Sequence, residues 1–461
     1  MSCFDHDQSR RAFLKRGAAL GIAGVATPFV TSLAAIGEAA AAVTSDYKAL
    51  VCIFLYGGND YANTLPPYDT TSYNQYQTAR SVLAIDRASL AATALTPTTA
   101  LPNGRQYALA PTMASLMPVF NAGKLAIALN VGTLVQPTTK AQYNAGIKLP
   151  PKLFSHNDQQ SYFQASSPEG AATGWGGRIG DLFQSGNGSS TLTCVNTSGN
   201  AVYLTGTSAV QYAVGTGGPI ALINNSTTLY SSATAMSTLK SMITGGSANI
   251  LANEHAKVTK RALDTYTQLN GALAGAPAAN FPLFPTGNSL ADQLKMVARM
   301  ISVSQELGAH RQVFFVSLGG FDMHDFLLRD HPSLIGRVAD AMRAFYDTTA
   351  ALGIADKVTT FTASDFGRTL QANDDGSDHG WGSHHFVMGG AVNGQKFYGT
   401  APAIGNGTPD DVGQGRLLPT ISVDQYAATL ASWFGVTSGQ MPTVLPNMNN
   451  YNPSTWNLGF V

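Results

Sequence analysis

The sequence predicts an α/β protein whose mostly parallel central sheet is flanked by helices. Short apolar runs rich in β-branched and aromatic residues predict buried strands, and stretches with apolar residues at three- and four-residue spacing predict helices. The two kinds of segment alternate along the chain, which is typical of a sheet covered on both faces. Ligands of such sheets bind beyond the carboxyl ends of the strands.

The predicted strands are 49–56, 125–131, 313–318, 358–362 and 386–388. The predicted helices are 111–122, 253–273, 289–307 and 333–352. Residues 275–287 form a Pro-rich connection. Residues 185–250 are rich in Ser, Thr, Gly and Asn, and predict an inserted, partly β subregion or cap.

The composition indicates a folded protein with little surface charge. Of 461 residues, 44% are hydrophobic and 12% are charged, against about 25% charged in average proteins. The apolar share is enough for a large core and excludes wholesale disorder. Basic and acidic side chains balance at 27 each, without a basic stripe, which argues against nucleic acid as a partner. The length fits two to three average domains or one large one, and we expect a single domain over 43–461.

The N-terminus carries the signature of an export signal. Residues 9–15, SRRAFLK, match a twin-arginine signal, and a weakly apolar stretch follows at 17–36. Small residues at 39–42 offer a cleavage site, so we expect a signal peptide over 1–42. The expected partner is therefore the twin-arginine translocase, the expected location is the periplasm or the exterior, and no membrane anchor remains after cleavage. The alternative is a retained anchor, because about twenty apolar residues can span a bilayer.

The mature chain would hold 23 basic and 24 acidic groups, and two cysteines. Cys52 lies in an apolar run and Cys194 in a strand-like run. They form either a disulfide or two buried thiols, and the thiols are favoured.

Two short polar motifs follow predicted strands directly. In GGFDMH, Asp322 and His324 point the same way if the loop is extended, so both are able to ligate one metal ion. In SDFGR, Asp365 is either a helix N-cap or an anionic metal ligand. Arg368 is close enough along the chain to meet an anionic substrate at the same place.

A Gly-rich loop at 377–385, SDHGWGSHH, holds three histidines and one Asp. These groups are costly to bury without partners, and a solvated loop does not account for a Trp beside three His. The pattern predicts a functional role for this loop. Which histidine binds a metal ion and which orients another ligand stays open at this point.

Three further positions precede these motifs. Asp60 ends the first predicted strand and is either an oxygen ligand or part of a turn. Ser155 opens a predicted helix as its N-cap, the favoured interpretation, or as a nucleophile at the helix N-terminus. Arg178 either contacts a substrate or pairs with Asp181 on the surface.

An ordered set of motifs resembles a known family: FLYGGND, LFSHNDQQ, GWGGRIGDL, GGFDMH, SDFGRT and DHGWGSHHFVMGG. They are similar to twin-arginine-exported bacterial proteins grouped as domain of unknown function 1501 (DUF1501), over nearly the whole mature chain. That family is placed with the alkaline phosphatase-like superfamily. The resemblance implies a largely parallel sheet flanked by helices, with one or two divalent metal ions at the strands' C-terminal ends.

The resemblance also implies roles for individual residues. The metal ligands it implies are Asp60, Asp322, His324, Asp365, and His379 or His384, and Ser155 falls near the nucleophile. Two positions depart from the superfamily pattern. Asp322 and His324 form D-x-H where D-x-x-x-H is usual, and Phe366 stands where a His usually follows the second Asp. These departures favour a single ion, or a site remodelled with His379 or His384.

The function implied is hydrolysis of a phosphate or sulfate ester in an anionic small molecule or polymer. A divalent ion (zinc, calcium or manganese) would bind the anion, with Arg178 or Arg368 stabilising the developing charge. The alternative is a non-catalytic exported protein that keeps a metal ion for stability or binds a surface polymer, because a fold does not determine a function.

Overall fold

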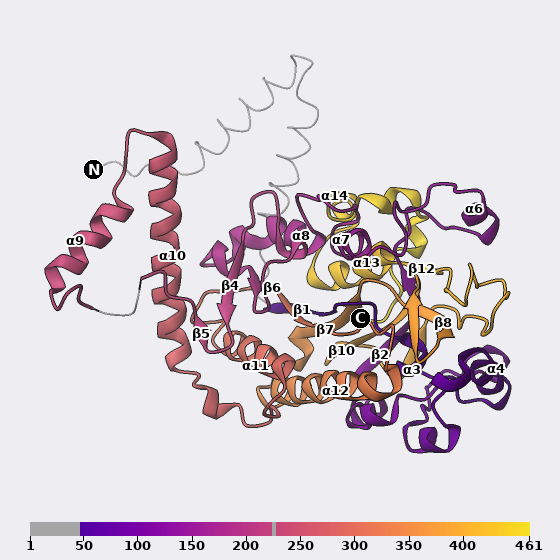
Figure 1. Cartoon of the computed structure of the whole chain (residues 1–461). Helices are drawn as coiled ribbons and strands as arrows, with labels where there is room; N and C mark the ends of the chain where they lie inside the picture. Colours follow the sequence, from indigo (N-terminus) through magenta and orange to yellow (C-terminus); the bar gives the residue numbers. More distant parts are fainter. Residues whose placement is uncertain (1–46, 224–226) are drawn as a thin grey trace, which may run out of the picture.

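The computed structural model describes residues 47–223 and 227–461, which form three layers with one mixed, mostly parallel sheet between helices (Figure 1). In that described part, the strands follow the order β11-β2-β10-β7-β1-β6-β3-β4-β5, with β12 also paired to β2. The sheet strands are β1 (Lys48–Leu55), β2 (Leu125–Gly132), β3 (Cys194–Asn196), β4 (Gln211–Gly215), β5 (Gly218–Pro219), β6 (Arg311–Leu318), β7 (Val358–Ser364), β10 (Ser383–Gly389), β11 (Lys396–Tyr398) and β12 (Ile421–Ser422). A separate hairpin joins β8 (Arg368–Asn373) to β9 (Gly376–His379).

The helices of the described ranges connect and cover these strands. They are α3 (Tyr61–Thr64), α4 (Thr70–Arg80), α5 (Met117–Asn121), α6 (Lys140–Asn144), α7 (His156–Ala165), α8 (Trp175–Phe183), α9 (Ala233–Thr244), α10 (Ile250–Ala274), α11 (Ser289–Ser302), α12 (Leu327–Ala351), α13 (Val423–Phe434) and α14 (Met441–Val444). Short 3₁₀ turns fill several connections.

Strand direction brings the polar loops together. The central strand β1 pairs in parallel with β6 on one side and β7 on the other, while β10 runs antiparallel to β7 and β2. The last residue of β1, Leu55, lies level with Leu318 of β6 and Ser364 of β7. The loops after β1, β6 and β7 and the segment before β10 therefore meet at one edge of the sheet.

The five predicted strands are confirmed as β1, β2, β6, β7 and β10, and three of the predicted helices as α10, α11 and α12. The segment 111–122 is divided, since a 3₁₀ turn over Pro111–Leu116 precedes α5. Pro118 has no backbone N–H to continue a helix from the preceding turn, and it is tolerated at the start of the next one. Within 185–250, β3 pairs in parallel with β6 and β4, so this segment extends the central sheet.

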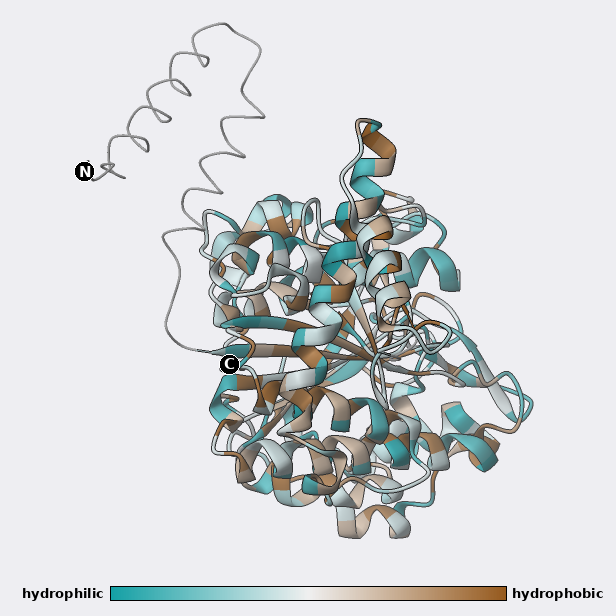
Figure 2. Cartoon of the chain, turned by 90° about the vertical axis from the view of Figure 1, so that its left-hand side faces the viewer, coloured by the Kyte–Doolittle hydropathy of each residue, from teal (hydrophilic) through white to brown (hydrophobic). Residues whose placement is uncertain are grey.

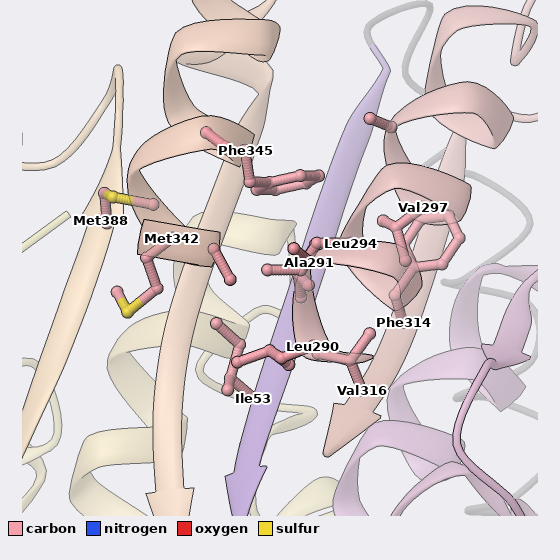
Figure 3. Packing of buried hydrophobic residues seen from close by; sticks show 14 of the residues in the cluster. Ile53, Leu290, Ala291, Leu294, Val297, Phe314, Val316, Met342, Phe345 and Met388 are labelled. Atoms are coloured by element: carbon pink, nitrogen blue, oxygen red, sulfur yellow. The ribbon is translucent and has the colours of Figure 1, made fainter. Parts of the chain in front are cut away.

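The core lies on both faces of the sheet. One cluster combines alternate residues of β1, such as Ile53, with α11 and α12, and the other combines the opposite residues with α7, α8 and α13. Figure 3 shows the first cluster, in which Leu290 and Leu294 of α11 lie beside Ile53 and Val316. Both described cysteines are free and buried in the second cluster, consistent with the favoured prediction of buried thiols.

The predicted signal peptide at 1–42 lies outside the described residues. Among the helices that are described, none combines the length and the apolar character needed to cross a membrane.

Candidate metal centre

The centre is built around Asp322, in the loop after β6. Gly57, after β1, has φ +112, and a Cβ there would lie 2.3 Å from the backbone N of Asp322. Only glycine allows this conformation and this approach together. The Gly57 N–H also donates to Asp365 Oδ2 at 3.2 Å, which links the loops after β1 and β7. The close packing of three loops thus fixes the positions of two carboxylates.

His156, the first residue of α7, reaches both carboxylates. Its Nδ1 lies 2.6 Å from Asp365 Oδ2, which also accepts from Gln160 Nε2 at 2.7 Å. The hydrogen bond with Asp365 raises the pKa of His156 above its usual value, although burial opposes this. Because a carboxylate accepts, Nδ1 carries the proton in the neutral ring and the Nε2 lone pair faces Asp322 Oδ2 at 3.3 Å. Nε2 is buried and makes no hydrogen bond to any described residue.

Two further imidazoles are oriented in the same manner. His379 Nδ1 lies 2.8 Å from the carbonyl oxygen of Phe154, and His324 Nδ1 lies 3.2 Å from Asp378 Oδ1. Since both oxygens accept, each neutral ring holds its proton on Nδ1 and presents a bare Nε2. Burial lowers the pKa of His379, which favours its neutral form.

These Nε2 atoms converge on Asp322. His324 Nε2 lies 3.1 Å from His379 Nε2, and the two nitrogens lie 3.0 and 3.2 Å from Asp322 Oδ1. The ligand atoms of His156, Asp322 and His379 also lie within 4.8 Å of one another. A tetrahedral zinc ion, with Zn–N distances of about 2.0–2.1 Å, separates its ligand atoms by about 3.3 Å. The triangle formed by His324 Nε2, His379 Nε2 and Asp322 Oδ1, with sides of 3.0–3.2 Å, is therefore close in size to one face of such a tetrahedron.

The arrangement meets the chemical requirements of a metal site. Lone pairs facing one another at these distances repel unless a proton or a cation lies among them. Histidines that bind metal ions usually donate the other ring N–H to a carboxylate or a carbonyl oxygen, as all three rings do here. The side chains of Asp322 and His324 are 42% and 41% exposed, so the centre is open to solvent.

Arg368 holds Asp322 in place through a hydrogen bond from the buried side of the centre. Its side chain is fully buried, and Nη1 donates to Asp322 Oδ1 at 2.6 Å and to the Gly57 carbonyl at 3.1 Å. Nη2 donates to the Ser377 carbonyl. Burial tends to raise the pKa of Asp322, but Arg368, with His156 and His324, holds it below its usual value. These contacts assign Arg368 the positioning of Asp322.

Asp60 does not join this cluster. Its Oδ2 pairs with Arg80 Nη2 at 2.6 Å, and its Oδ1 accepts from Asn63 N at 2.9 Å as the N-cap of α3. Burial tends to raise the pKa of Asp60, yet Arg80 and His331 hold it below the usual value. Asp60 connects to the centre through Ser377 Oγ, which donates to Oδ2 at 3.3 Å.

The remaining predicted residues have other partners. Ser155 is the N-cap residue of α7, but its hydroxyl donates to Asp158 Oδ2 at 2.9 Å and not to a backbone N–H. Arg178 donates to the carbonyls of Val444, Thr173 and Ala165. His384 is buried in β10, where Nδ1 accepts from Asn130 N at 3.0 Å.

Sequence reasoning did not select His156, Asp378 or Arg80. His156 stood within the motif LFSHNDQQ, beside Ser155, but its role depends on Asp365, which is 209 positions away. Asp378 belonged to the predicted loop, and the D-H pair at 378–379 was the available signal. Arg80 ends a polar helix and offers no local sign of its burial against Asp60.

A cleft of about 500 Å³ adjoins the centre. It runs from Asp322 and His324 along the first turns of α12, where Ser333 and Arg337 line it. The cleft is where a bound molecule would meet the exposed side of the cluster.

Comparison with known proteins identifies a family but no activity. A family model described as "Protein of unknown function (DUF1501)" matches residues 47–443. No curated protein matches the chain. Among solved structures, the crystal structure of Ps i-CgsB matches with 10% identity and a TM-score of 0.35, over 88% of this chain and 78% of that one. Its complex with k-i-k-neocarrahexaose matches with 11% identity and a TM-score of 0.32, over 89% of this chain and 78% of that one. Likeness at this level supports no conclusion about this chain.

Proposed function

The chain belongs to the DUF1501 family, whose description assigns no activity, and we propose from its own site that it binds one divalent cation and hydrolyses phosphate or sulfate esters. The proposed ligands are Asp322, His324 and His379, with His156 as the fourth. An alkaline phosphatase-like fold is part of the same proposal, supported by the mostly parallel sheet and by a centre at its strand ends.

The observation that carries the proposal is the common orientation of three imidazoles. Each donates Nδ1–H to a fixed oxygen and presents Nε2 to Asp322. Imidazole-rich ligand sets suit zinc better than calcium or manganese, which prefer oxygen ligands. We therefore favour zinc over calcium and manganese.

Charge supports one ion in preference to two. Arg80 neutralises the charge of Asp60. Around the imidazoles this leaves one positive charge, that of Arg368, and three negative ones, those of Asp322, Asp365 and Asp378. With neutral histidines the remaining charge is −2, which one divalent cation balances.

The protein side chains would hold and orient the reactants. A divalent cation at this centre would supply polarisation of the ester oxygens and a lowered pKa for water. Asp365 and Asp378 keep His156 and His324 in the required tautomer, and Arg368 fixes Asp322. The cleft beside His324 would accept the rest of the ester.

One observation favours the non-catalytic alternative, an exported protein that binds a metal ion or a surface polymer. The three side chains predicted to be catalytic, those of Ser155, Arg178 and Arg368, all bond to other protein groups. Hydrolysis at this centre would therefore depend on water as the nucleophile.

Metal analysis of the purified protein tests the proposal. We expect about one equivalent of zinc in the wild-type chain, and a loss of affinity of about 100-fold or more in His324→Ala and His379→Ala. His255→Ala, at an exposed position on α10, is the matched control and should bind normally. Hydrolysis is then assayed with p-nitrophenyl phosphate and p-nitrophenyl sulfate. Absence of metal refutes the hydrolase and the metal-binding form of the alternative, and metal binding without hydrolysis of any ester supports that form of the alternative.

We also propose export through the twin-arginine route, which rests on SRRAFLK at 9–15. Replacement of Arg10 and Arg11 by Lys should retain the protein inside the cell, as measured by fractionation. Normal export of that variant would contradict the assignment.

A further inference from the structure

The helices α9 and α10 form an arm, residues 233–274, that extends from the body (Figure 1). The C-terminal part of α10 packs into the core through Leu269 and Leu273. Its N-terminal end and the turn from α9 stand clear of the remaining fold, as Figure 2 shows. We call this end, residues 241–251, the tip of the arm.

The tip exposes large apolar side chains. Met242, Ile250 and Leu251 are 75%, 81% and 78% exposed. Of the fourteen exposed large hydrophobic residues in the described part of the chain, seven lie within 220–258. Single exposed apolar residues are ordinary on protein surfaces, but a cluster at a projecting end marks a binding surface.

Basic side chains lie behind this apolar end. The arm has four basic residues, Lys240, Lys257, Lys260 and Arg261, and two acidic ones that pair with Lys257 and Lys260, so its net charge is +2. Lys257 lies seven positions after Ile250 on the same helix, which is about 10 Å along its axis. Apolar groups that enter the acyl region to about 5–10 Å would place such basic groups at the level of the lipid headgroups.

We propose that the tip of the arm inserts into an anionic lipid surface, with Met242, Ile250 and Leu251 among the acyl chains and the basic residues against the headgroups. Charge complementarity supports this occupant, because lysine and arginine next to a membrane favour anionic lipids. A second copy of the chain fits less well. A stable protein interface buries about 1,200–2,000 Å² in total, which three side chains at the end of a narrow hairpin do not provide.

The experiment measures co-sedimentation of the full chain with vesicles of phosphatidylcholine alone or mixed with phosphatidylglycerol. We expect binding to the mixed vesicles that weakens with added salt, since salt screens the charges on the arm. The variant Met242→Ser, Ile250→Ser, Leu251→Ser should bind at least about tenfold more weakly. Lys240→Glu with Arg261→Glu should remove the preference for phosphatidylglycerol.

The matched control replaces three exposed apolar residues elsewhere, Val82, Leu283 and Leu352, by Ser and should bind as the wild type does. Metal content and thermal unfolding should be unchanged in the tip variant, because its three side chains are exposed. Equal binding by tip and control variants would overturn the proposal. So would a dimer of the wild-type chain in light scattering that the tip substitutions abolish, because the occupant would then be a second copy.

Discussion

Two carboxylates at neighbouring strand ends should respond to substitution in opposite ways. Asp60→Asn should lower the free energy of unfolding and leave metal binding intact. Asp322→Asn should abolish metal binding with a smaller loss of stability. The difference follows from their partners, since Asp60 neutralises a buried arginine and Asp322 receives three imidazole nitrogens.

The magnitudes follow from burial. The Asp60 and Arg80 side chains are 2% and 0% exposed. Removing the Asp60 charge therefore leaves the Arg80 charge buried without a partner, at a cost of about 3–5 kcal/mol in the free energy of unfolding. Asp322 is 42% exposed, and in its variant Arg368 keeps the carbonyls of Gly57 and Ser377 as acceptors. Losing one charged hydrogen bond there costs about 1–3 kcal/mol.

Urea unfolding and metal titration of the purified variants measure the two effects separately. Unfolding is followed in the presence of chelator, so that metal binding does not contribute to stability. If Asp60→Asn lost its metal and kept its stability, the assignment of Asp60 to structure and Asp322 to the metal centre would be refuted.

Three further predictions follow from buried groups. Unfolding stability in chelator should be about 3 kcal/mol lower at pH 5.5 than at pH 7.5. Three buried histidines stay neutral in the fold and take up protons on unfolding below pH 6.5, because burial lowers their pKa values to about 4 for His331 and about 3 for His384 and His385. The carboxyl group of Asp424 offsets part of this loss, because burial raises its pKa to about 6. Equal stability at the two pH values would contradict this origin. Gly57→Ala should weaken metal binding at least about tenfold, because its Cβ displaces Asp322; Gly104→Ala, also at positive φ but with open space around it, should bind metal normally. Leu294→Ala should cost about 2–5 kcal/mol in urea unfolding, since the side chain is fully buried under β1, and a loss below about 1 kcal/mol would contradict the packing.

The sheet was predictable because its strands are buried on both faces and therefore appear as continuous apolar runs. Strand direction was not, because FVM at 386–388 would have the same pattern in either orientation. The antiparallel pairing of β10 with β7 and β2 depends on partners far away in the sequence. Likewise, β3 has only three residues, and its place beside β6 has no local signature.

In the loop 377–385, the local sequence pattern did not distinguish the histidine at the centre from the one in the core. His379 and His384 stand five positions apart in one Gly-rich motif, and both are typical of a ligand. The structure separates them, because β10 begins at Ser383 and is buried along its length, which takes His384 and His385 into the core. The apolar FVM after the two histidines was the signal for this, because it continues the same buried strand.

The two buried arginines support the proposal of one metal ion, and not two, at this centre. Asp60 and Asp322 follow β1 and β6, two adjacent parallel strands, so their carboxylates would repel without cations between them. Arg80 neutralises the first, and Arg368 holds the second while also bonding to Ser377, whose hydroxyl donates to Asp60. Ser377 and the guanidinium of Arg368 thus form a continuous hydrogen-bonded path between the two carboxylates. The proposed metal ion would be needed only where Asp322 turns away from this path, toward the Nε2 atoms of His156, His324 and His379.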